Sequence, residues 1–198
     1  MTAIVLAGGR SRRLGRNKAL ELFGDRPLIQ HVIDTVSMID EDIIVVAAAK
    51  TQLPKLDTRV KVVTDCYPVG GALVGIFTGL KAARTQSSIV VACDMPFLKV
   101  DLLRYLMSVS QGIDAVIPRV GKMIEPLHAV YSQNCLNPIW AQIESDNLKI
   151  SDLLDKVKVR YVERDEIERY DPQRLSFMNI NSEEDLKKAR QMMEKVRR

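Results

Sequence analysis

Long apolar runs are absent from this sequence. Its apolar stretches, such as residues 43–49 and 89–93, are far shorter than the roughly twenty residues that a membrane-spanning helix needs. The N-terminus enters a strand-like segment directly, without the charged and apolar regions of a secretory signal. These absences predict a cytoplasmic protein that does not contact a membrane.

Cysteine, histidine and aromatic residues are scarce as well. The 3 cysteines (Cys66, Cys93 and Cys135) and 2 histidines have no zinc-type spacing, so we expect free thiols in a reducing compartment. Aromatic residues make up 5% of the chain, which argues against the stacking surfaces that bind single-stranded nucleic acid. No serine lies in a nucleophile elbow, so no Ser-His-Asp triad is expected. The net charge of +4 instead favours a small, phosphate-rich substrate.

What is present is an alternation of short apolar segments with amphipathic ones. The length of 198 residues and the content of 46% hydrophobic residues predict a single domain, 1–198. Runs rich in Ile and Val predict strands at 3–6, 43–48, 61–64, 89–93, 114–117, 127–131 and 157–163. Helical periodicity predicts helices at 27–38, 72–84, 101–109, 138–143 and 152–154, and a capping box at 182–185 begins a last helix. Together these segments predict an α/β fold with a Rossmann-like, doubly wound, mostly parallel sheet and helices on both faces.

The loop after the first predicted strand is rich in glycine and in basic residues. Residues 7–18, AGGRSRRLGRNK, contain three glycines, four arginines and a lysine. Glycine lets backbone N–H groups approach a phosphate closely, and the cations neutralise its charge. The spacing excludes a P-loop, because Lys18 is not followed by Ser or Thr, and it also excludes a dinucleotide fingerprint. The loop therefore predicts a polyphosphate site of another type.

Two aspartates follow later predicted strands. Asp94, in the segment CDMPFL at 93–98, is a candidate magnesium ligand, with a turn-capping role as the alternative. Asp65 precedes a glycine-rich segment that begins a helix, where backbone donors and the helix dipole favour an anion. Its carboxylate suits the base or the ribose of a nucleotide, with helix capping as the alternative.

Polar side chains in the second half are candidates for binding a ligand. Asn179 and Asn181, in the segment NINSEEDL, alternate on one side of a predicted strand, so both amides point at one ligand, unless they only shape a turn. His128, in EPLHAVY, either faces a ligand or is a core histidine.

With these motifs in this order, the chain resembles the MobA family of molybdenum cofactor guanylyltransferases over almost its whole length. The resemblance implies a fold of the nucleotide-diphospho-sugar transferase type, with residues 1–110 binding the nucleotide and 111–198 the acceptor. It implies transfer of GMP from GTP to molybdenum-bound molybdopterin with release of pyrophosphate, and a cofactor-receiving apoenzyme as a further partner. It assigns residues as follows: nucleotide binding to Leu6, Ala7, Gly8, Lys18, Asp65 and Asp94; catalysis to Arg13, Lys18 and Asp94; Mg²⁺ to Asp94; and the acceptor to Asn179, Asn181 and His128.

Two departures from the family pattern keep alternatives open. Ala72 stands where the family usually has proline, and Ala47–Ala49 stand where it often has an asparagine that binds the nucleotide. The alternatives are cytidylyl transfer to the same cofactor, or guanylyl transfer to another phosphorylated acceptor such as adenosylcobinamide phosphate. A nucleotide-binding regulator without turnover is the third alternative, but it would have little use for both Lys18 and Asp94.

Overall fold

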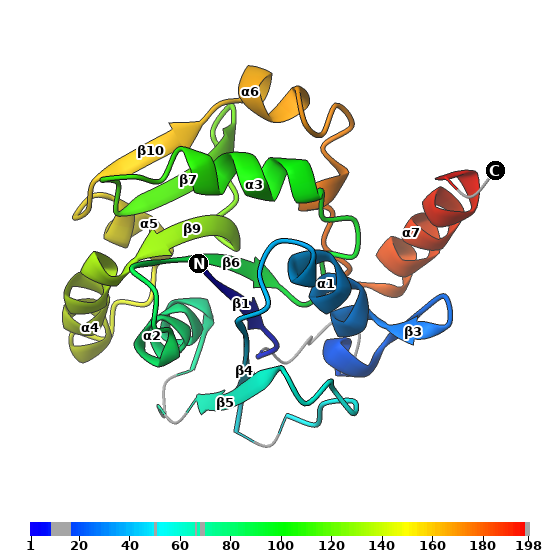
Figure 1. Ribbon diagram of the computed structural model, residues 1–198, viewed down its shortest axis with the longest axis horizontal. Helices are drawn as coiled ribbons and strands as arrows, with labels where there is room; N and C mark the ends of the chain where they lie inside the picture. The colour runs from blue at the N-terminus through cyan, green and yellow to red at the C-terminus, as the bar shows by residue number, and fades with distance from the viewer. Residues whose placement is uncertain (9–16, 50, 66, 68–69, 197–198) are drawn as a thin grey trace.

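The computed structural model describes residues 1–8, 17–49, 51–65, 67 and 70–196, with the side chains of 194–196 left aside. Within this part of the chain, eight strands form one sheet, in which seven follow the order β10-β7-β9-β6-β1-β4-β5 and β8 pairs with β7 (Figure 1). The strands are β1 (Thr2–Leu6), β4 (Ile43–Ala48), β5 (Lys61–Asp65), β6 (Ser87–Ala92), β7 (Ala115–Val120), β8 (Met123–Ile124), β9 (His128–Ser132) and β10 (Val159–Val162). A separate hairpin pairs β2 (Leu22–Phe23) with β3 (Arg26–Pro27).

The first half of the chain forms the parallel part of the sheet. Strand β1 pairs in parallel with both β4 and β6, and Leu6 lies opposite Val46 on one side and Ala92 on the other. Strand β5 extends this part beyond β4, whereas β9 is antiparallel to both β6 and β7. The chain adds strands on one side of β1 and then returns to the other, so the carboxyl end of β1 is a point where such sheets bind ligands.

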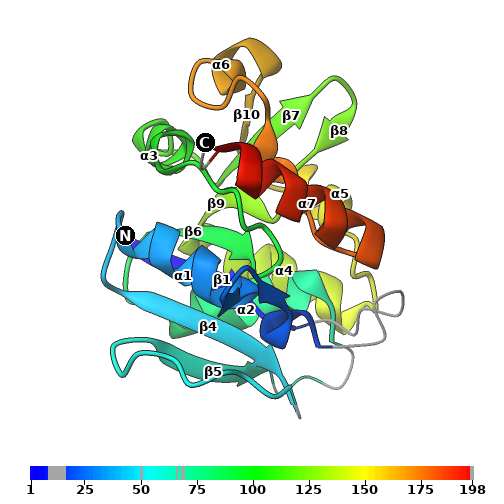
Figure 2. The same ribbon diagram turned by 90° about the vertical axis from the view of Figure 1, so that its right-hand side faces the viewer.

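Helices cover both faces of the sheet, as predicted. One apolar cluster packs α1 (Leu28–Ser37), α3 (Val100–Ser108) and α6 (Arg164–Glu168) against one face. A second cluster packs α2 (Ala72–Ala82), α4 (Leu136–Glu144) and α5 (Ile150–Leu154) against the opposite face (Figure 2). The α/β fold with a mostly parallel, doubly wound sheet is therefore confirmed.

Helix α2 packs unusually close to the central strand. A Cβ built on Gly79 would lie 2.5 Å from Cγ2 of Ile4, and one built on Gly75 would lie 3.3 Å from Cδ2 of Leu6. Two glycines on one helix face therefore let α2 lie against β1, which brings the N-terminus of the helix to the carboxyl end of the sheet.

The last helix, α7 (Glu183–Val196), packs away from the main layers. A small third cluster joins Leu186 and Ala189 of α7 to Phe23 and Leu28, together with Ile180 of the preceding segment. Gly24, which has a φ of +67°, turns the β2–β3 hairpin against Met193. The β2–β3 hairpin and the C-terminal helix α7 thereby pack together beside the sheet (Figure 1).

Three details differ from the sequence predictions. The predicted strand at 157–163 ends as β10 at Val162, because Glu163 and Glu166 form a capping box that begins α6. Asn179 and Asn181 lie outside any strand, in a segment without regular secondary structure that follows the 3-10 helix η3 (Leu175–Phe177). The β2–β3 hairpin, β8 and α6 were not predicted. In the described part of the chain, no helix combines the length and the apolar character needed to cross a membrane.

Candidate active site

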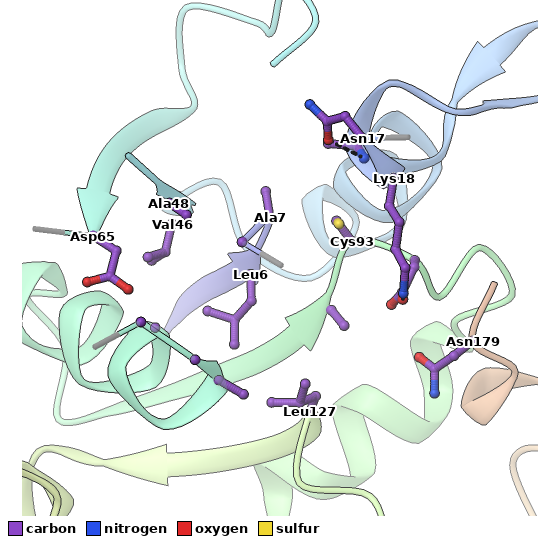
Figure 3. Close-up of a pocket in the computed structure, with 18 of the residues that line it drawn as sticks. Leu6, Ala7, Asn17, Lys18, Val46, Ala48, Asp65, Cys93, Leu127 and Asn179 are labelled. Carbon is purple, nitrogen blue, oxygen red and sulfur yellow. Dashed lines mark hydrogen bonds and ion pairs between the residues drawn. The ribbon is translucent and has the colours of Figure 1, made fainter. Parts of the chain in front are cut away.

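A cavity of about 590 Å³ opens at the carboxyl edge of the parallel strands (Figure 3). It is lined by the ends of β1, β4, β5 and β6, by the start of α2, and by residues from the C-terminal part of the chain. The sequence-predicted residues among its lining are Leu6, Ala7, Gly8, Lys18, Asp65, Asp94, Asn179 and Asn181. Segments that are distant in the chain thus meet in one site.

Lys18 begins the 3-10 helix η1 (Lys18–Leu20) and extends into this cavity (Figure 3). Asn17 caps the helix, because its side chain accepts a hydrogen bond of 3.1 Å from the N–H of Ala19. The Lys18 ammonium donates to Oδ2 of Asp94 at 2.5 Å and also to the amide oxygen of Asn181. The predicted meeting of Lys18 and Asp94 in one cavity is therefore present.

Asp94 follows β6 and is held by the backbone on both sides. The N–H of Cys93 donates to the carbonyl of Leu6 at 3.1 Å, and the Asp94 carbonyl accepts from the N–H of Ile180 at 3.0 Å. The carboxylate is largely buried but lines the cavity. Burial raises the pKa of the neighbouring Cys93 thiol to about 12, and the Asp94 charge adds to this shift, so the thiol stays protonated.

The residues around Asp94 fit a divalent cation that arrives with a phosphate ligand. No group of three or more His, Cys, Asp and Glu side chains converges within the described ranges, so the protein side offers no complete metal cage. One carboxylate, with phosphate oxygens and water filling the remaining positions, is how Mg²⁺ commonly binds in phosphoryl-transfer sites.

Asp65 lies across the cavity from Lys18, at the end of β5 (Figure 3). The residue is 8% exposed, and its carboxylate accepts a hydrogen bond of 3.2 Å from the N–H of Tyr67. Gly70 and Gly71 then adopt φ angles of +61° and +107° before α2 begins at Ala72. The positive end of the α2 dipole and a buried carboxylate therefore stand side by side, which suits a ligand with both an anionic and a hydrogen-bond-donating part.

Asn179 and Asn181 both line the cavity, although they do not form a strand. The residue between them, Ile180, is fully buried in the small cluster beneath α7. Ile180 therefore packs into the core between two amides that line the cavity. The alternation was predicted correctly, and its assignment to a strand was wrong.

His128 does not line the cavity. It is fully buried in β9, and neither ring nitrogen has a hydrogen-bond partner among the described residues. Its ring packs in a T-shaped arrangement with Phe177 at a centroid distance of 5.1 Å, and burial lowers the pKa of His128 to about 3. The adjacent Leu127 lines the cavity instead. His128 therefore supports the wall of the site as a neutral core histidine.

Some contributors to the cavity could not be identified from the sequence, and one predicted residue lies outside the described ranges. Asn17 lies in the glycine-rich loop 7–18 and Leu127 in the segment EPLHAVY, but neither was singled out, although the capping position of Asn17 before a short helix is a recognisable signal. Arg13 belongs to residues 9–16, so its predicted role is not placed by the structure.

Comparison with known proteins assigns the family. The sequence model for the "MobA-like NTP transferase domain" matches residues 3–160, which is most of the chain. The chain belongs to the MobA-like NTP transferase family. It is therefore a nucleotidyltransferase, and enzymes of this kind generally use a divalent metal ion.

Full-length relatives of this MobA-like chain carry more specific names. It is 37% identical over 196 residues to a "probable molybdenum cofactor guanylyltransferase" of Pelotomaculum thermopropionicum, covering 99% of this chain and 95% of that one. It is also 37% identical to the "molybdenum cofactor guanylyltransferase" of Desulfosudis oleivorans, covering 96% and 94%. The crystal structure of "molybdopterin-guanine dinucleotide biosynthesis protein A" from Archaeoglobus fulgidus superposes with a TM-score of 0.86 at 30% identity, covering 98% and 100%.

Proposed function

We propose that this protein transfers GMP from GTP to molybdenum-bound molybdopterin, forming the guanine dinucleotide cofactor and releasing pyrophosphate. The observation that carries the proposal is the Lys18–Asp94 pair in a cavity at the carboxyl edge of the sheet. In one cavity, the ammonium group can bind a triphosphate and the carboxylate can bind the cation that accompanies it. The names of the full-length relatives support the choice of substrates.

The nucleotide occupies the part of the cavity formed by residues 1–110 in this proposal. Leu6, Ala7 and Gly8 line it at the end of β1, and their backbone groups would contact the nucleotide. Asp65 accepts hydrogen bonds from the guanine N–H groups or from the ribose. Neither contact requires the asparagine that the family often has at the end of β4, where Ala48 lines the cavity in this chain.

The acceptor occupies the part formed by residues 111–198, beside Asn179 and Asn181. A phosphate oxygen of the acceptor attacks the α-phosphorus of GTP, and the bond from that phosphorus to pyrophosphate breaks, so no covalent enzyme intermediate is needed. Lys18 and Arg13 neutralise the charge that builds on the departing pyrophosphate. Mg²⁺ held by Asp94 would supply further charge neutralisation at the phosphate oxygens. Catalysis then rests on positioning and electrostatics. A cofactor-receiving apoenzyme would take the product.

The absence of an asparagine at the end of β4 favours one alternative, cytidylyl transfer to the same acceptor. Ala48 lines the cavity there and offers no hydrogen bond from its side chain. The deciding experiment measures pyrophosphate release with each of the four ribonucleoside triphosphates, with and without molybdopterin. Release with GTP and molybdopterin supports the proposal, whereas release with CTP alone replaces it with the alternative. Binding without any release points to a regulator.

The same assay tests the two charged residues. We expect Asp94→Asn and Lys18→Met each to lower turnover by about two to three orders of magnitude, because each removes preorganised charge. Asp101→Asn is the matched control, since Asp101 is exposed on α3 and does not line the cavity. Wild-type turnover in either site variant would remove that residue from the mechanism.

A further inference from the structure

Lys18 has two oxygen acceptors, and they come from different parts of the chain. One is the carboxylate of Asp94 at 2.5 Å, and the other is the amide oxygen of Asn181, which is 163 residues from Lys18 in sequence. The side chain of Lys18 is only 16% exposed, so both acceptors bind it in a largely enclosed position. A largely desolvated ammonium group benefits more from a second acceptor than an exposed one does.

The backbone at Asn181 is fixed on both sides. The preceding Ile180 is buried and donates its N–H to the Asp94 carbonyl at 3.0 Å. The N–H of Asn181 itself donates to Oδ2 of Asp185 at 3.1 Å, and Ser182 donates to the same carboxylate at 2.8 Å. These hydrogen bonds hold the pKa of Asp185 below its usual value, so the carboxylate remains an acceptor. The direction of the Asn181 side chain is therefore set by the start of α7.

If Asp94 holds a divalent cation during the reaction, the cation and the Lys18 ammonium compete for its carboxylate. The two compete because positive charges a few ångströms apart repel each other. Lys18 then needs another acceptor to stay at the triphosphate. A neutral amide provides one without attracting the cation and without repelling phosphate, as a carboxylate would.

We propose that Asn181 is a positioning residue for Lys18: it holds the ammonium beside the triphosphate once the cation has taken Asp94. This inference rests on the proposed function and deepens it, because it moves Asn181 from acceptor binding to the nucleotide side of the reaction. Asn179 makes a different contact, since its amide nitrogen donates to the carbonyl of Phe177 at 3.4 Å. Asn179 remains the residue for the acceptor.

The test is the affinity for GTP with Mg²⁺ in the absence of acceptor, measured by isothermal titration calorimetry. Asn181→Ala should weaken GTP binding about tenfold, the effect of losing one hydrogen bond to a charged group. Asn179→Ala is the matched control, because it lies two residues away and lines the same cavity; GTP affinity should stay within about twofold of wild type. In a Lys18→Met background, Asn181→Ala should have no further effect, because the residue acts through Lys18.

Two further results separate the possible failures. Unchanged GTP affinity in Asn181→Ala, with a raised KM for molybdopterin, would overturn the inference and return Asn181 to the acceptor. Additive losses in the double variant would also overturn it. A wild-type protein that binds no GTP would overturn the proposed function itself, and this inference with it. Asn181→Asp gives a second variant: its added negative charge should weaken GTP binding more than Asn181→Ala does, and equal or tighter binding counts against the proposal.

Discussion

At the scale of single residues, His128 shows how burial alone sets a chemical property. The ring is fully buried, and its nitrogens have no hydrogen-bond partner among the described residues. Charging it would place an unpaired cation in the core, so its pKa is lowered from 6.5 to about 3. The folded state therefore holds a neutral imidazole at every pH at which the enzyme is expected to work.

This lowered pKa predicts a specific acid sensitivity. Below pH 6.5 His128 is protonated in the unfolded chain but stays neutral in the folded chain. The unfolding free energy is therefore unaffected by His128 above pH 6.5, and it falls as the pH drops toward 3. Between pH 7 and pH 5 the wild type should lose about 2 kcal/mol more unfolding free energy than His128→Leu. Urea unfolding at both pH values measures the difference, and the remaining titrating groups are common to both proteins. Equal pH dependence in the two would contradict the assignment.

The charged residues of the site were predictable from sequence because their positions follow simple rules. Residues after parallel strands share one edge of the sheet, so Asp65 and Asp94 had to come close to the end of β1. The contact of Asn181 with Lys18 was not predictable. It depends on how α7 packs against the β2–β3 hairpin, and no local pattern near either residue encodes that packing.

At the scale of elements, the approach of α2 to β1 depends on Gly79. A methyl group there would lie 2.5 Å from Cγ2 of the buried Ile4, so the helix or the strand must shift. We expect Gly79→Ala to lower the unfolding free energy by about 1–3 kcal/mol, since overpacking outweighs the gain in helix propensity. Gly75→Ala is the control, because its methyl group would lie 3.3 Å from Leu6 and should cost less. Urea unfolding of the three proteins is the measurement, and a more stable Gly79→Ala would refute the close packing.

The elements that the sequence did not predict are short and depend on distant partners. The β2–β3 hairpin has two residues on each strand, and Phe23 within it packs against Leu186 and Ala189 of α7. Helix α6 is five residues long and is held by Glu166, which binds Arg160 and Tyr105. Periodicity needs longer segments to give a signal. The long buried strands and the amphipathic helices show a clear periodicity, and their positions were predicted to within a few residues.

At the scale of the whole molecule, the cavity joins the two halves of the chain. Its lining takes Asp94 and the end of β1 from residues 1–110, and Leu127 and Asn179 from residues 111–198. The hydrogen bond from Ile180 to Asp94 connects the halves through the backbone, next to the Lys18–Asn181 contact. A ligand bound on the nucleotide side should therefore reduce the opening of the C-terminal segment 178–186, even without an acceptor.

Hydrogen exchange tests this coupling directly. Suppose that segment 178–186 can open only by leaving the Asp94 loop. GTP with Mg²⁺ then raises the free energy of opening by RT ln(1 + [L]/Kd). At a ligand concentration of a hundred times Kd, the open population falls about 100-fold. Mass spectrometry should show slower exchange in peptides from 178–186 when GTP is present. Peptides from 159–168, which hold β10 and α6 and do not line the cavity, provide the internal control and should keep their rates. The protection should disappear in Asp94→Asn, because the loop then lacks the carboxylate proposed to hold the cation. If 178–186 exchanges at one rate with and without GTP, the two halves bind independently and the coupling through Ile180 does not exist.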